Sequence, residues 1–184
     1  MINEYEATQP ATDPNFETAN APRETVDNDE VISTLNGLIE TCKDGQEGFQ
    51  EAAEGVESQD LKRLFYECSQ QRSEFTGELQ SLVRSLGGDP ETSSSFAGAL
   101  HRGWMNIKTA VTGNDEKAIL NECERGEDSA KNNFQAALQK TLPANIFEVV
   151  QKQYTAVLDV HDKIKALRDA ANQGGTSSSA ATGY

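Results

Sequence analysis

The chain has 184 residues, of which 36% are hydrophobic, and this is enough to enclose one hydrophobic core. Its formal net charge of −14 opposes binding to phosphate groups, so we expect neither nucleic acid nor a membrane surface as a partner. No stretch approaches the roughly 18 apolar residues of a membrane span, and the N-terminus lacks the basic and apolar regions of a signal peptide. These features predict a cytoplasmic protein.

The two ends of the sequence differ in composition from the region between them. Residues 1–26 contain Pro, Thr, Asn and acidic residues without an apolar period, and residues 173–184 are rich in Gly and Ser. We expect both ends to be disordered tails. They would flank a single domain, residues 27–172.

Capping residues and helix breakers divide this domain into helices. Asp27 followed by Glu30 resembles a capping box, and Ser58 can cap a second helix. Further breaks are expected at Gly87-Gly88, at Gly113-Asn114, at Leu142-Pro143 and at Asn172 to Gly175.

Four segments alternate steps of four and three residues between side chains that are mostly apolar or small. They run from Val31 to Val56, from Leu61 to Leu86, from Glu116 to Thr141 and from Ile146 to Leu167. Such seams are typical of long helices that pack together. The sequence therefore predicts an all-α fold, a four-helix bundle.

A further set of apolar residues at helical spacing lies between the second and third of these helices. The set consists of Phe96, Leu100, Trp104, Ile107 and Val111. We expect an accessory helix from Pro90 to Thr112, which at about 1.5 Å per residue would extend about 30 Å. A connection of this length can return the chain to the end at which the second helix began. The third helix would then be parallel to the second, in up-down-down-up order.

One charged residue lies on the seam near the middle of each of two helices. Arg72 belongs to the second helix and Glu127 to the third, and they lie at the same level if these helices run parallel with matched starts. Gln153 on the fourth helix lies close to that depth. The first helix contributes only the small residues Cys42 and Gly45 there, which leaves room for a guanidinium. We expect a buried polar layer of Arg72, Glu127 and Gln153, because a buried carboxylate needs a counter-charge or a metal.

Several stretches resemble, in the same order, motifs of a bacterial four-helix-bundle family of unknown function. They are LNGLIETCKDGQEGF, QQRSEFTGELQ, LHRGW, ECERGED and VHDKIKALRD, and the likeness covers about residues 28–170. A four-helix bundle with a long connection between its second and third helices also resembles the ferritin-like superfamily. This resemblance implies a ferritin-like bundle with an accessory crossover helix, and it implies no activity.

Di-iron members of that superfamily use a Glu from each of two helices and a Glu-x-x-His pair from each of the other two. Here Gly98 stands three residues before His101 and Leu158 stands three before His161, so neither histidine completes the pair. Arg72 also places a positive charge where a metal ion would gather carboxylates. We therefore expect no catalytic residue, no bound metal and no cofactor.

The sequence favours a non-catalytic bundle with a stress-related or scaffolding role. The alternative is a metal-binding protein of the di-iron type, an oxidase or an iron-handling protein, with an irregular site. Glu124, Glu127 and His161 would form that site. A third reading is a regulatory module whose tails recruit partners.

The remaining candidate residues have structural interpretations. The cysteines, Cys42, Cys68 and Cys123, occupy seam positions without a CxxC motif, so we expect free and inert core thiols. Trp104 is expected to cover the bundle, and the alternative is that the crossover helix mediates a homo-oligomer or binds a protein partner.

Two further expectations concern polar residues away from the seams. His161 lies one residue off its seam, and a helix-packing or surface role is expected for it. Four acidic residues are expected to form a solvated face: Glu40, Glu47, Glu67 and Glu122.

Overall fold

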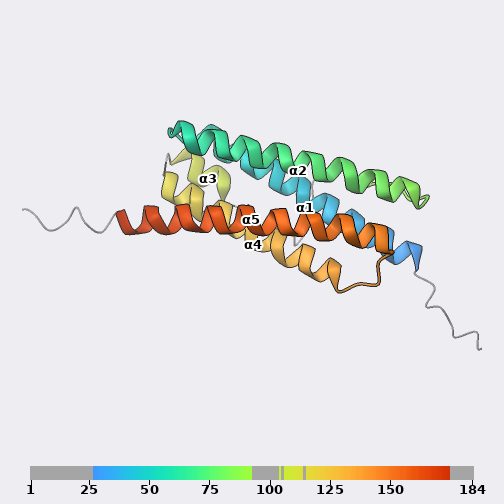
Figure 1. Ribbon diagram of the computed structural model, residues 1–184. Helices are drawn as coiled ribbons and strands as arrows, with labels where there is room; N and C mark the ends of the chain where they lie inside the picture. Colours follow the sequence, from blue (N-terminus) through green and yellow to red (C-terminus); the bar gives the residue numbers. More distant parts are fainter. Residues whose placement is uncertain (1–26, 93–103, 105, 114, 175–184) are drawn as a thin grey trace, which may run out of the picture.

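A computed structural model describes residues 27–92, 104, 106–113 and 115–174. This part of the chain forms an all-helical bundle of five helices and contains no strand (Figure 1). The helices are α1 (Asn28–Gly55), α2 (Gln59–Ser85), α3 (Ile107–Thr112), α4 (Glu116–Leu138) and α5 (Ala144–Gly174). The expected tails, residues 1–26 and most of 173–184, lie outside the described residues.

Polar side chains cap the N-termini of α1, α2 and α4 by accepting hydrogen bonds from free backbone N–H groups. Asp27 accepts from Asp29 at the start of α1, and Ser58 accepts from Leu61 at the start of α2. Both expected caps are thereby confirmed. Asp115 caps α4 in the same way, a role that the sequence analysis did not assign to it.

The end of α2 follows the expected Gly-Gly signal. Gly87 has a φ of 81°, in the left-handed region that glycine adopts at little cost. The N–H of Gly88 then donates to the carbonyl of Val83, so that a late carbonyl of α2 is satisfied. The chain can therefore turn sharply out of the helix.

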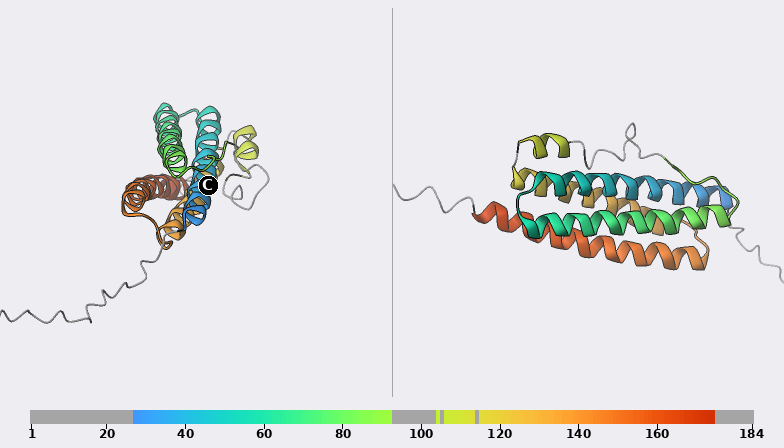
Figure 2. Two further views of the ribbon diagram at one scale, coloured as in Figure 1. Left: turned by 90° about the vertical axis from the view of Figure 1, so that its right-hand side faces the viewer. Right: turned by 90° about the horizontal axis from the view of Figure 1, so that it is seen from above.

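The four long helices lie alongside one another, and α3 lies outside them against α1 and α4 (Figure 2). Glu116, at the start of α4, accepts a hydrogen bond of 3.0 Å from the N–H of Ser58, the residue that caps α2. Near the other end, Lys140 after α4 pairs with Glu30 at the start of α1. Helices α2 and α4 thus begin at the same end of the bundle.

The described part of the connection before α3 is less helical than the sequence predicts. Pro90–Thr92 are not helical, residues 93–103 lie outside the described part, and α3 spans only Ile107–Thr112. Two of the apolar residues assigned to an accessory helix, Phe96 and Leu100, are among the residues that are not described. The extended start has a physical cause, because the side chain of Asn36 exchanges hydrogen bonds with the backbone of Asp89 and Glu91.

The hydrophobic core consists of two clusters. One joins the N-terminal half of α1 to the C-terminal halves of α2 and α4 and to the N-terminal half of α5. The other joins the opposite halves of the same helices to α3 and Trp104. Arg72 and Glu127, both buried, fall between the two clusters in the sequence order of their helices. No described helix is long and apolar enough to cross a membrane.

Candidate functional site

The most deeply buried charges of the described chain are Arg72 of α2 and Glu127 of α4. One terminal nitrogen of Arg72 donates to both carboxylate oxygens of Glu127, at 2.9 and 2.7 Å, and each side chain is 1% exposed. The other terminal nitrogen donates to Gln71 at 3.1 Å. The guanidinium carbon also lies 5.6 Å from the centre of the Phe75 ring. The structure therefore places the predicted arginine and glutamate in direct contact.

Burial is the strongest influence on both charges. It raises the pKa of Glu127, and the adjacent Arg72 acts in the opposite direction. Burial also works to lower the pKa of Arg72, but the carboxylate outweighs it and raises this pKa above its ordinary value. The arginine thus stays protonated, and its positive charge favours the ionised form of Glu127.

Gln153 is buried, as expected of a seam residue, but it forms its hydrogen bond outside the ion pair. Its amide nitrogen donates to Glu78 of α2 at 2.8 Å. Glu78 lies nearly two turns beyond Arg72 on α2. A carboxylate accepts a stronger hydrogen bond from an amide than a neutral group does. The observed polar layer therefore contains Arg72 and Glu127, with Gln71 at its edge in place of Gln153.

The three cysteines are free and buried. Burial raises the pKa of Cys42 and of Cys68 to about 12, and it raises that of Cys123 well above 9.0. A thiol with so high a pKa is almost entirely protonated at neutral pH and is a weak nucleophile. Their expected positions in the core are confirmed.

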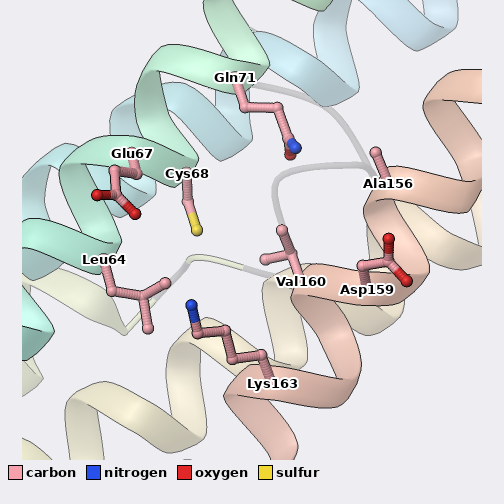
Figure 3. Close-up of a pocket in the computed structure, with 8 residues that line it drawn as sticks. All are labelled: Leu64, Glu67, Cys68, Gln71, Ala156, Asp159, Val160 and Lys163. Carbon is pink, nitrogen blue, oxygen red and sulfur yellow. The ribbon is translucent and has the colours of Figure 1, made fainter.

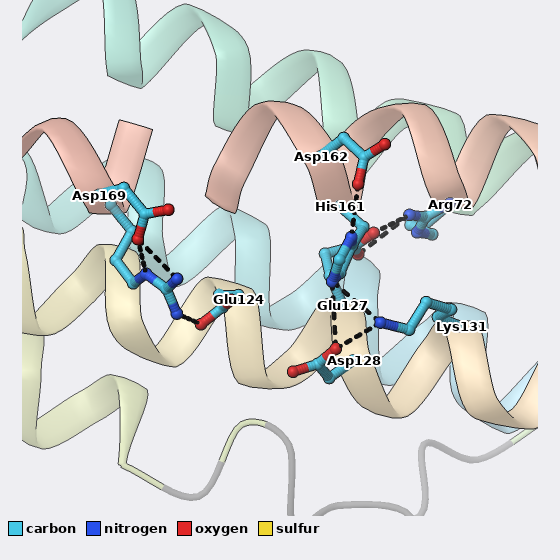
Figure 4. A network of polar contacts seen from close by, with 9 residues as sticks. Arg72, Glu124, Glu127, Asp128, Lys131, His161, Asp162 and Asp169 are labelled. Atoms are coloured by element: carbon cyan, nitrogen blue, oxygen red, sulfur yellow. Dashed lines mark hydrogen bonds and ion pairs between the residues drawn. The ribbon is translucent and has the colours of Figure 1, made fainter. Parts of the chain in front are cut away.

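A second polar cluster lies between α4 and α5 (Figure 4). Ligand atoms of Glu124, Asp128 and His161 all lie within 4.8 Å of one another. His161 is 8% exposed, with Nε2 3.1 Å from Asp128 and Nδ1 3.0 Å from Asp162. Burial works to raise the pKa of Asp128, but Lys131 and His161 outweigh it and hold this pKa below its ordinary value. We call Glu124, Asp128 and His161 the α4–α5 cluster.

This cluster differs from the irregular metal site considered in the sequence analysis. Glu124 and His161 belong to both, but Glu127 is held by Arg72, and Asp128 takes its place beside the imidazole. Glu127 and Asp128 are three and four residues from Glu124, so both lie near its face of α4, and the contact of Glu127 with Arg72 separates them. The spacing could have added Asp128 to the candidates from the sequence.

Two cations already contact the cluster. Lys131 lies 2.7 Å from Asp128 and 3.1 Å from His161 Nε2, while Arg168 donates to Glu124. Arg168 also donates to Asp169 at 2.6 Å. Neither cation was assigned to this site from the sequence, although Lys131 follows Asp128 by about one helical turn.

Trp104 covers the bundle, as the sequence analysis expects. Its indole is 5% exposed and lies 5.0 Å from the Phe49 ring in an edge-on arrangement. The indole fits between Gly48 of α1 and Gly126 of α4, where a Cβ atom would approach it to 2.2 Å. Because the ring is enclosed by its own chain, it is not available as the anchor of an interface.

One of the four acids assigned to a solvated face is buried. Glu122 is 5% exposed and binds Arg125 of its own helix, with Asn106 at 3.5 Å. The expectation for this residue was wrong, because the segment around α3 covers that side of α4. Glu47 and Glu67 are exposed and Glu40 is half-buried.

A groove of about 240 Å³ separates α2 from α5 (Figure 3). The sulfur of Cys68 points into it, between Leu64 and Val160, and Lys163 reaches toward it from α5. Gln71 also lines the groove and accepts from Arg72. The buried ion pair is therefore linked to this opening by one hydrogen bond.

The fold and these residues define an all-helical bundle protein with an ion pair in its core. The chain belongs to the family described as Domain of unknown function (DUF2383), which it matches over residues 30–140. The match begins near the start of α1 and ends just after α4. A search among curated proteins returned no match.

Proposed function

We propose that this chain is a ferritin-like bundle in up-down-down-up order, and that it acts without catalysis, in a stress-related or scaffolding role. In this proposal the Arg72–Glu127 ion pair occupies the level at which di-iron relatives would hold metal. Residues 27–172 are the functional domain, and residues 1–26 and 173–184 are tails. The protein works in the cytoplasm.

One observation carries this proposal, namely the contact of one Arg72 nitrogen with both oxygens of Glu127. A carboxylate whose two oxygens are taken by a guanidinium offers no strong donor to a metal ion. The same positive charge repels a divalent cation from the centre of the bundle. The family description, a domain of unknown function, is compatible with this role and assigns no other.

Oxidation of Fe²⁺ by the full-length protein in air tests the proposal. The expected rate equals that of a solution without protein, and Glu127→Gln leaves it unchanged. The opposing result is oxidation that the wild type accelerates and that Glu127→Gln abolishes, since it would place iron chemistry at the core carboxylate. Glu148→Gln is the matched control, because it removes an exposed carboxylate of α5 outside both the ion pair and the α4–α5 cluster.

A further inference from the structure

We propose that the α4–α5 cluster is a mononuclear binding site for a divalent first-row transition ion of the zinc class. Glu124, Asp128 and His161 would each supply one ligand atom. The site lies outside the Arg72–Glu127 pair, and it does not depend on whether the bundle is catalytic.

The imidazole is oriented as a ligand. When Nδ1 carries the proton and donates to Asp162, at 3.0 Å, the lone pair of Nε2 faces Asp128 at 3.1 Å. Metal-binding histidines are commonly oriented in this way, by a carboxylate on the nitrogen that does not bind the ion. The His161 side chain is 8% exposed, so its ring is held firmly between the helices.

Three acceptors then lie close together, within 4.8 Å of one another. The lone pair of His161 Nε2 and the carboxylates of Asp128 and Glu124 repel one another unless a positive group lies between them. In the structure Lys131 fulfils this requirement, since its amine contacts both Asp128 and His161. In this tautomer the cluster needs a positive group, and the Lys131 amine supplies it at Asp128 and His161.

The competing side chains can withdraw. Lys131 is 26% exposed on a flexible stem, so its amine can move into solvent. Arg168 keeps its contacts with Asp169 when it releases Glu124. Neither cation would be left without a partner or water.

The donor set indicates which ion fits. One imidazole with two carboxylates suits zinc and related ions, whereas magnesium and calcium favour oxygen ligands alone. Three protein ligands leave a position for water. The separations within 4.8 Å require the side chains to close in by about 1 Å to reach a zinc–ligand distance near 2.0–2.2 Å.

Titration of the chelator-treated, full-length protein with Zn²⁺, and with Co²⁺ as a spectroscopic probe, tests this site. We expect one ion per chain and a shift of the ¹⁵N resonance of His161 Nε2. His161→Ala should weaken binding at least tenfold, and Asp162→Asn, which alters an exposed residue, should weaken it about 10–100-fold. His101→Ala, which removes the other histidine, is the control and should bind normally.

Lys131→Gln distinguishes a metal site from a purely structural cluster. Because it removes the competing amine, it should strengthen Zn²⁺ binding, whereas a loss of structure would weaken it. Circular dichroism of each variant reports whether the bundle is folded. The proposal is overturned if the wild type takes up no ion, if folded Asp162→Asn and His161→Ala bind normally, or if Co²⁺ gives a thiolate charge-transfer band.

Discussion

A guanidinium can lie in the centre of this bundle because the residues around it leave space and supply a charge. A Cβ atom at Gly45 would lie 3.4 Å from the Arg72 side chain, so alanine would fit there and a larger residue would displace the arginine. Glu127 compensates the charge from the opposite helix. Removing either partner of such a pair strands the other in an apolar environment.

Replacement of the pair one residue at a time should be more damaging than replacement of both. We expect Arg72→Leu to lower the free energy of unfolding by about 3–5 kcal/mol, because Glu127 is then buried alone. Arg72→Leu combined with Glu127→Leu should cost far less than the sum of the single changes. Urea unfolding of the four proteins measures this coupling, and additive losses would show that the two residues do not act together.

The dependence on pH provides a control for the same variants. In Arg72→Leu, burial raises the pKa of Glu127 without the opposing effect of Arg72, so the ionised carboxylate destabilises the folded state above that pKa. This penalty disappears as the pH falls below 4.5, the ordinary value, where both states bind the proton. The deficit of Arg72→Leu relative to wild type should therefore shrink at acidic pH. In the double variant Glu127 is absent, so no such change is expected.

The thiols provide a second prediction at the scale of residues. Cys42, Cys68 and Cys123 should react slowly with a thiol reagent in the native protein and completely in denaturant, because they are buried and protonated. Mass spectrometry after timed labelling measures both rates. Rapid labelling of the native chain would contradict their assignment as inert core residues. Cys68→Ala identifies the contribution of the thiol that lines the α2–α5 groove.

At the scale of elements, one side chain attaches the connection before α3 to the long helices. Trp104 lies between α1 and α4, and this contact requires glycine at positions 48 and 126. Glycine inside a helix is unfavourable by about 1 kcal/mol relative to alanine. At these two positions the close approach of the indole accounts for its presence.

Gly126→Ala should therefore expel the indole. Its Cβ would lie 2.2 Å from Trp104, so we expect a loss of about 1–3 kcal/mol and a red shift of the fluorescence of the chain's one tryptophan. Gly45→Ala is the matched control, since its Cβ has room and the emission should not change. If both variants keep the wild-type spectrum and stability, Trp104 does not occupy this position in solution.

At the scale of the whole molecule, the sequence predicted the helices better than it predicted their side-chain partners. The repeat of apolar residues and the caps at Asp27 and Ser58 depend on local chain geometry, which the sequence contains. The contact of Arg72 with Glu127 followed from counting levels along two seams. All of these inferences use only distances along a helix.

The remaining features depend on competition between partners in space. Gln153 is buried as expected, but it donates its hydrogen bond to Glu78. Glu122 was expected on a solvated face, but the segment around α3 covers that side of α4. His161 met Asp128 instead of Glu127 because Arg72 already held the glutamate. Helix periodicity gives the face of a residue, but it does not show which of several nearby groups bonds to it.

The sparse contact between α2 and α5 has a mechanical consequence. The bundle is a pair of helical hairpins, α1–α2 and α4–α5, joined along the line where α1 meets α4 and much less along the opposite edge. That line can act as a hinge, and the Arg72–Glu127 ion pair, which links α2 to α4, holds the two hairpins together. The strength of this ion pair sets the free energy of local opening between the hairpins, and thus whether they unfold as one cooperative unit or as two.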